Sequence, residues 1–185
     1  MMEEKSMLDD IQRELFTKEE LAAIVSRIGR EISWDYRGKN LLMVSVLKGS
    51  VVFMADLMRA VTEPLSIDFM VVSSYGKGVK TSGVVKIVLD LNIPLEEYDL
   101  LIVEDILDSG KTLSYLREVL EARNPKSIKI CTLFDKPERR EADVTPDYVG
   151  ARIPDAFIVG YGLDYAGKYR NLPFVGVLKP EVYAS

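Results

Sequence analysis

Apolar residues along this chain form short branched runs that alternate with segments of helical spacing. The runs at residues 41–46, 100–103 and 128–134 are mostly apolar, which is typical of strands buried on both faces of a sheet. Apolar residues three and four positions apart follow the first two runs and predict amphipathic helices. Because strand and helix alternate, we expect an α/β fold with a mostly parallel central sheet and helices on both faces.

Local signals predict where several elements begin or end. Thr17 and Glu20 have the spacing of a capping box, so we expect a helix from there to about Tyr36, ending near Gly38. A second helix is expected after the turn at residues 48–50. The other predicted strands lie at residues 66–73, 84–91, 157–161 and 174–178.

The segment at residues 99–113 carries the candidate chemistry. Two adjacent carboxylates, Glu104 and Asp105, follow the buried run at the point where the strand is expected to end, and a turn at residues 108–112 leads into the next predicted helix. A turn between a strand and a helix offers free backbone N–H groups and the positive end of the helix dipole, so it suits a phosphate. The two acids would repel phosphate, so we expect them to bind sugar hydroxyls, a divalent cation, or both.

This segment has two other interpretations. Gly110, Lys111 and Thr112 match the last three positions of a Walker A phosphate loop. That motif requires another glycine five residues earlier, where this chain has Asp105, so we reject it. The other interpretation is an ordinary strand, turn and helix with solvated acids, which leaves the coincidence of three acids with a Ser-Gly-Lys-Thr turn unexplained.

Length and composition limit the function classes. With 185 residues, the chain is expected to form a single domain over residues 1–185. Its net charge is −5 and it has no basic block, so nucleic acid is not an expected partner. No apolar stretch approaches the roughly 20 residues of a membrane span. The acidic and polar residues 1–10 do not resemble a signal peptide, so we expect a cytoplasmic protein without membrane partners.

The chain has no histidine and a single cysteine, Cys131. Acid–base catalysis must therefore use Asp, Glu, Lys or Tyr side chains. A metal site must use carboxylate oxygens, which favours magnesium or manganese over zinc. Cys131 lies within an apolar run, so we expect a buried structural thiol rather than a nucleophile.

The pattern of two acids, two apolar residues and Asp-Ser-Gly-Lys-Thr at residues 104–112 resembles the phosphoribosyl-pyrophosphate (PRPP) motif of the type I phosphoribosyltransferases. Further segments narrow the resemblance to the hypoxanthine-guanine phosphoribosyltransferases, and they lie at residues 47–50, 73–76, 135–137, 155–164 and 169–170. The resemblance extends over roughly residues 10–183. It implies that family's fold with a small base-binding hood. It also implies Mg²⁺ as cofactor, PRPP with hypoxanthine or guanine as substrates, IMP or GMP and pyrophosphate as products, and a homodimer or homotetramer.

The resemblance assigns the central segment to PRPP. The residues that would bind the phosphate and the ribose are Glu104, Asp105, Asp108, Ser109, Gly110, Lys111 and Thr112. Pyrophosphate would be bound by Lys48, Gly49 and Arg170. The Leu47–Lys48 peptide bond beside them is often cis in this family. Magnesium would be bound by Glu104, Asp105 and Asp164.

The resemblance also assigns a base site, which would be lined by Lys136, Phe157, Ile158 and Asp164. Lys136 would donate to the oxygen at C6 of the purine, and Phe157 would stack on its ring unless it is an ordinary core residue. Asp108 would accept the N7 proton as N9 attacks, and its alternative role is to cap the following helix. Ser74 and Tyr75 would help to close the site, at the start of a glycine-rich, polar and basic connection at residues 75–83. That connection is expected to be a mobile loop over an anionic ligand, or a plain hairpin loop.

Two other functions are compatible with parts of this pattern. A regulatory protein could keep the fold to sense PRPP or nucleotide, but such regulators usually carry an added nucleic-acid-binding domain or a basic face. A phosphoribosyltransferase for adenine, orotate or xanthine is the other alternative. Lys136 and the Phe157–Ile158 pair disfavour adenine and orotate and do not exclude xanthine.

Overall fold

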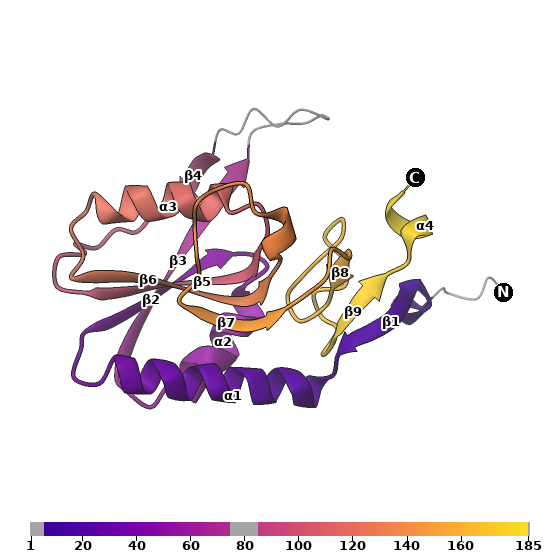
Figure 1. Cartoon of the computed structure of the whole chain (residues 1–185), viewed down its shortest axis with the longest axis horizontal. Helices are drawn as coiled ribbons and strands as arrows, with labels where there is room; N and C mark the ends of the chain where they lie inside the picture. Colours follow the sequence, from indigo (N-terminus) through magenta and orange to yellow (C-terminus); the bar gives the residue numbers. More distant parts are fainter. Residues whose placement is uncertain (1–5, 75–84, 185) are drawn as a thin grey trace.

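A six-stranded sheet forms the centre of the molecule (Figure 1). Its strand order is β4-β3-β2-β5-β6-β7. The computed structural model describes residues 6–74 and 85–184, so the predictions for Tyr75 and for the loop at residues 75–83 lie outside the described residues. The strands are β2 (Leu41–Leu47), β3 (Leu65–Ser74), β4 (Val85–Leu89), β5 (Asp99–Leu107), β6 (Ser127–Asp135) and β7 (Tyr148–Arg152). The pairs between β3, β2, β5, β6 and β7 are all parallel, and β4 runs antiparallel to β3. The predicted mostly parallel α/β sheet is confirmed.

Helices cover both faces of this sheet (Figure 1). The helices α1 (Lys18–Asp35) and α2 (Val51–Ala60) pack on one face, and α3 (Lys111–Glu121) packs on the other. Alternate residues of β2 enter the two cores: Leu41 and Met43 face α1 and α2, whereas Leu42 and Val44 face α3. The uninterrupted apolar runs therefore arise because both faces of the strands are buried.

The start of α1 has the predicted capping box. The Thr17 hydroxyl accepts a hydrogen bond from the Glu20 N–H at 3.1 Å, and the Glu20 carboxylate accepts one from the Thr17 N–H at 2.8 Å. These two bonds satisfy backbone donors that the helix itself cannot pair. The helix ends at Asp35 with Tyr36 as its C-cap, close to the predicted end.

A second, three-stranded antiparallel sheet forms the hood, in the order β1-β9-β8. Its strands are β1 (Ile11–Phe16), β8 (Ile158–Val159) and β9 (Val175–Leu178), so segments from both ends of the sequence lie side by side (Figure 1). The late strands are shorter than predicted, and β1 and β7 were not predicted. Both missed strands are only partly buried, so they lack a strong apolar pattern. Short helices at Met7–Asp10 (η1), Pro137–Arg139 (η2) and Pro180–Tyr183 (α4) complete the described elements.

The central strand β5 is longer than predicted. It continues past the acid pair to Leu107, because its pairing with β6 extends from Asp99 opposite Ser127 to Leu107 opposite Asp135. The acid pair therefore belongs to a hydrogen-bonded strand and has a rigid backbone. No helix among residues 6–74 and 85–184 is long and apolar enough to cross a membrane.

Candidate active site

The turn between β5 and α3 has a geometry that suits an anion. Gly110 has a φ of +81°, which glycine adopts easily, and it is the N-cap of α3. A side chain on Gly110 would lie 2.6 Å from Cγ1 of Val144, so this position also needs glycine for space. The Ser109 carbonyl accepts hydrogen bonds from the N–H groups of Glu141 at 2.9 Å and Ala142 at 3.0 Å. These contacts hold the turn while the first N–H groups of α3 remain without helical partners.

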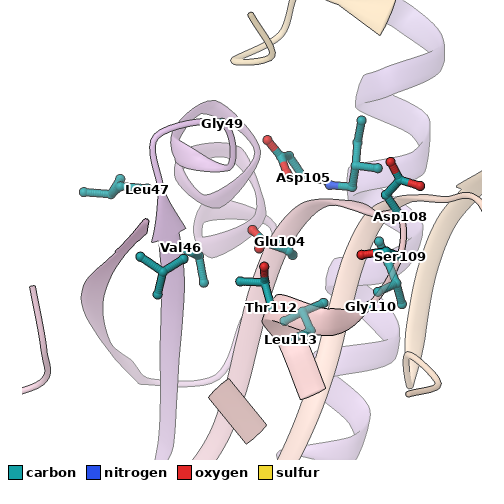
Figure 2. A pocket seen from close by; sticks show the side chains of 13 residues that line it. Val46, Leu47, Gly49, Glu104, Asp105, Asp108, Ser109, Gly110, Thr112 and Leu113 are labelled. Atoms are coloured by element: carbon teal, nitrogen blue, oxygen red, sulfur yellow. Dashed lines mark hydrogen bonds between the residues drawn. The ribbon is translucent and has the colours of Figure 1, made fainter. Parts of the chain in front are cut away.

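The predicted phosphate residues are mostly brought together, with one exception. A cavity of about 270 Å³ is lined by Glu104, Asp105, Asp108, Ser109, Gly110 and Thr112, together with Gly49. Figure 2 shows the residues from the end of β5 and the start of α3 around the cavity, with Gly49 in the loop after β2. Lys111 does not line it; it is the first residue of α3, and its side chain is ion-paired with Glu141. Only the backbone of Lys111 can therefore serve a phosphate in this conformation.

The two adjacent acids are poorly solvated. Burial raises the pKa of Glu104 well above its ordinary value, and the neighbouring Asp105 carboxylate raises it further. Burial also raises the pKa of Asp105 to about 6, although a hydrogen bond from the Ile106 N–H and the Arg170 charge oppose this shift. Carboxylates in this state gain stability from a bound cation or from hydroxyl donors. The pair therefore suits sugar hydroxyls and a divalent ion better than it suits open solvent.

The three predicted magnesium ligands do not form a ready-made cluster. Asp105 and Asp164 line one common cavity, whereas Glu104 lines only the cavity beside the turn. Within the described part of the chain, no group of three or more acidic or cysteine side chains is placed to hold a metal ion. Magnesium in enzymes is usually held by one or two carboxylates together with substrate phosphates and water. The donors present fit that mode and do not form a closed cage.

The loop after β2 contacts the acid pair directly. The Leu47–Lys48 peptide bond is cis, in agreement with the resemblance. The buried hydroxyls of Ser45 and Ser50 lie 2.7 Å apart and close the base of the loop. A Cβ atom on Gly49 would lie 1.6 Å from Oδ2 of Asp105, so the loop backbone packs against this carboxylate.

A third segment, which follows β8, packs against the loop after β2. A Cβ atom on Gly162 would lie 2.3 Å from the carbonyl oxygen of Gly49. Arg170 donates to the Gly162 carbonyl at 2.7 Å and is ion-paired with Asp164 at 2.8 Å. Arg170 and Lys48 line the same cavity, as expected for two ligands of one anion.

That second cavity has a volume of about 670 Å³ and contains the predicted base site. Its lining includes Lys48, Gly49, Asp105, Ile106, Asp108, Lys136, Phe157, Ile158, Asp164 and Arg170. Lys136 is 8% exposed, and its ammonium donates to the Ala156 carbonyl at 2.8 Å. Phe157 is 38% exposed and stacks on Tyr183 with ring centroids 4.9 Å apart, so it is not an ordinary core residue.

Asp108 lies where the two cavities meet, since it lines both. Its carboxylate does not cap α3: Gly110 is the N-cap, and no side-chain cap bond is present there. Oδ1 of Asp108 instead accepts a hydrogen bond from Nε of Arg139 at 2.8 Å. The alternative role of Asp108 as a helix cap is therefore wrong.

Sequence reasoning missed several residues that line the base cavity: Ile106, Arg139, Asp155 and Tyr183. A signal existed for Arg139, because the basic segment at residues 136–140 adjoins Lys136. No local signal places Tyr183, which reaches Phe157 from the last described helix. Ser74 ends β3, and its predicted partner in loop closure, Tyr75, lies outside the described residues.

Comparisons with known proteins agree with this geometry. The family model of the phosphoribosyl transferase domain matches residues 12–166. The hypoxanthine-guanine phosphoribosyltransferase of Bacillus subtilis is 52% identical over 97% of this chain and 99% of its own length. A crystal structure of a hypoxanthine phosphoribosyltransferase from Staphylococcus aureus superimposes with a TM-score of 0.94 at 48% identity, over the whole of both chains. The bifunctional protein TilS/HprT of Listeria monocytogenes is 51% identical over 97% of this chain, which spans only 28% of that longer protein.

Proposed function

The chain belongs to the phosphoribosyltransferase family, among the hypoxanthine-guanine phosphoribosyltransferases, and we propose that it is a purine salvage enzyme. It transfers the 5-phosphoribosyl group of PRPP to N9 of hypoxanthine or guanine and releases pyrophosphate. The observation that carries this proposal is the pair of adjoining cavities that share Asp108. One has a phosphate turn and two acids, and the other has a buried lysine beside a partly exposed aromatic ring.

The cavity beside the turn takes the phosphoribosyl group. Backbone N–H groups at the start of α3 and the hydroxyls of Ser109 and Thr112 bind the 5′-phosphate. Glu104 and Asp105 accept hydrogen bonds from the 2′- and 3′-hydroxyls. Asp108 lines both cavities, so a ribose held by these groups would present its anomeric carbon toward Asp108 and the second cavity.

Lys48, the Gly49 backbone and Arg170 bind pyrophosphate. Arg170 is held by the Gly162 carbonyl and by Asp164, so its planar guanidinium is fixed in the cavity wall. Magnesium, when bound to Asp105 or Asp164 and to the substrate, supplies positive charge to the departing pyrophosphate. These residues orient the leaving group and screen its developing charge.

The base cavity selects a 6-oxopurine. Phe157 offers a ring for stacking, and the Lys136 ammonium offers hydrogen-bond donors to the oxygen at C6. In the reaction the bond between C1′ and the pyrophosphate oxygen breaks, and the bond between C1′ and N9 forms. The N7 proton passes to the Asp108 carboxylate, which acts as the general base.

The assembly and location of the enzyme are also part of the proposal. We expect a homodimer or homotetramer in the cytoplasm, by analogy with the family. Light scattering of the purified protein measures the oligomeric state directly.

The decisive test is an activity assay with a panel of bases. The purified chain is mixed with PRPP, Mg²⁺ and one of hypoxanthine, guanine, xanthine, adenine or orotate, and nucleotide formation is followed by chromatography. We expect IMP and GMP, and no product in excess chelator, with activity restored by added magnesium. Absence of nucleotide with every base would refute the proposed function, and full activity in chelator would refute the metal requirement.

A further inference from the structure

Four charged side chains of alternating sign follow one another along the wall of the base cavity. Asp108 is paired with Arg139 at 2.8 Å, and Arg139 is paired with Asp155 at 3.2 Å. Asp155 lies 3.8 Å from the ammonium of Lys136, which completes the row. The row therefore links the proposed base Asp108 to the residue that reads C6, through Arg139 and Asp155.

We propose that Arg139 is a positioning residue that holds the Asp108 carboxylate in the orientation needed to accept the N7 proton. This inference rests on the proposed function and concerns a residue that the sequence motif does not contain. Arg139 itself does not receive the proton. It acts through Asp108.

The guanidinium geometry supports this role. Nε of Arg139 donates to Oδ1 of Asp108, while NH1 of the same planar group lies 3.4 Å and 3.2 Å from the two oxygens of Asp155. A rigid fork held at two carboxylates restricts the rotation of both. Among the described residues, Oδ2 of Asp108 has no hydrogen-bond partner. One oxygen of the proposed base is thus fixed and the other is left to accept a proton.

The neighbouring arginine shows what a structural role looks like in this segment. The Arg140 side chain donates to the backbone carbonyls of Asp108 at 3.1 Å and Val144 at 2.8 Å, and it is paired with the buried Asp135. Arg140 therefore holds the backbone of the turn. In the described part of the chain, the hydrogen bonds and ion pairs of the Arg139 side chain all go to carboxylates, and this side chain is about half-exposed.

An exposed ion pair of this kind contributes little to folding. Loss of the Arg139 side chain is therefore expected to leave the fold intact, so a catalytic effect can be measured without a stability effect. The expected loss lies in the proton-transfer step, because a base that is misplaced by a fraction of an ångström transfers protons less well.

The test compares Arg139→Met, which keeps the apolar stem, with Arg139→Lys, which keeps a cation. Arg117→Met is the matched control, because Arg117 is also about half-exposed and paired with a carboxylate, Glu121, on the outer side of α3. For hypoxanthine, we expect kcat to fall about 10-fold in Arg139→Met, while KM for PRPP and the melting temperature stay unchanged. Arg139→Lys should recover part of the loss, and Arg117→Met should behave as the wild type.

A base analogue isolates the contact to N7. The analogue of hypoxanthine with carbon in place of N7 has no N7 proton to give to Asp108, so it is used as a competitive inhibitor. We expect its inhibition constant to be the same in Arg139→Met and in the wild type. An inhibition constant that rises together with the loss of kcat would mean that Arg139 shapes the base cavity in general, and the inference would be withdrawn.

Failure of this inference is distinguishable from failure of the proposed function. If the wild type forms no IMP, the proposed function itself is wrong. If the wild type forms IMP and kcat of Arg139→Met equals that of Arg117→Met, Arg139 does not position the base. A drop in kcat that Arg139→Lys does not relieve at all would also overturn the role, because a second cation at this position should partly restrain Asp108.

Discussion

Gly49→Ala tests whether the contact between the loop after β2 and the acid pair controls catalysis. The new Cβ atom would lie 1.6 Å from Oδ2 and 2.8 Å from Cγ of Asp105. Carbon and oxygen atoms in van der Waals contact are separated by more than about 3 Å, so the Asp105 carboxylate must move by roughly 1.5 Å. A displacement of about 1 Å in a catalytic group can lower the rate about 10²-fold.

We therefore expect kcat/KM for PRPP to fall by at least about 10²-fold, which corresponds to about 2.7 kcal/mol. Folding stability should change little, because the displaced atoms are the end of a side chain at a cavity wall. Initial rates with hypoxanthine and PRPP measure the first quantity, and thermal unfolding measures the second.

Gly38→Ala is the matched control. Gly38 has a φ of +70°, and no atom lies within 4 Å of the position that a Cβ would take, so alanine there causes backbone strain without a clash. It should lower the free energy of unfolding by about 1 kcal/mol and leave kcat/KM unchanged. Gly49→Ala should thus lose activity and keep its stability, whereas Gly38→Ala should lose stability and keep its activity.

A double-variant cycle identifies the partner. If Gly49→Ala acts through the carboxylate, it should cost little further activity when it is added to Asp105→Ala. Additive losses, or a Gly49→Ala enzyme that keeps nearly all of the wild-type activity, would refute the reasoning that the loop acts on Asp105.

Other parts of the structure support three more predictions. Asp108→Asn should lower kcat by about 10²–10⁴-fold and leave PRPP binding intact, because the phosphate turn binds mostly through its backbone. Isothermal titration with PRPP measures the binding, and a loss of PRPP binding at unchanged kcat would contradict the catalytic role of Asp108. The ratio of kcat/KM for hypoxanthine to that for adenine should exceed about 10², because Lys136 offers only hydrogen-bond donors to the group at C6. Lys136→Ala should lower this ratio. Hydrogen bonds from Tyr148 and Lys129 hold the pKa of Asp35 below its ordinary value. The ionised Asp35 therefore stabilises the fold above about pH 4, and this contribution is lost as the pH falls through the lowered pKa. The urea midpoints of wild type and Asp35→Asn should differ at about pH 7 and converge toward about pH 3.

Features that depend on near neighbours in sequence were predictable. The capping box at Thr17 and Glu20 and the turn at Gly110 each lie within a few residues, and the structure has both. The central sheet was also predictable, because strands buried on two faces must be apolar throughout.

Features that depend on distant pairing were not predictable in the same way. The strand β1 carries exposed charged residues and is defined only by its pairing with β9. The length of β5 depends on its pairing with β6. The sequence does not indicate this length, because the acids Glu104 and Asp105 interrupt the apolar run before the strand ends. The Arg139–Asp108 contact joins the turn after β5 to the short helix η2 after β6, and these segments come together only when β5 and β6 pair. The hydrophobic periodicity of the sequence does not predict such contacts.

The pairing of β1 with β9 has a consequence for the order in which the enzyme is completed. The phosphate turn needs only β5, α3 and the strands beside them, all of which precede the hood strands β8 and β9 in the sequence. The base cavity needs Ile158 of β8 and Phe157 just before it, and β8 is held against β1 only through β9. During synthesis, β1 emerges early and must wait for its partner until almost the whole described chain has been made. The half of the site that recognises the purine is therefore the last to be completed, and a chain that ends before β9 cannot assemble the hood.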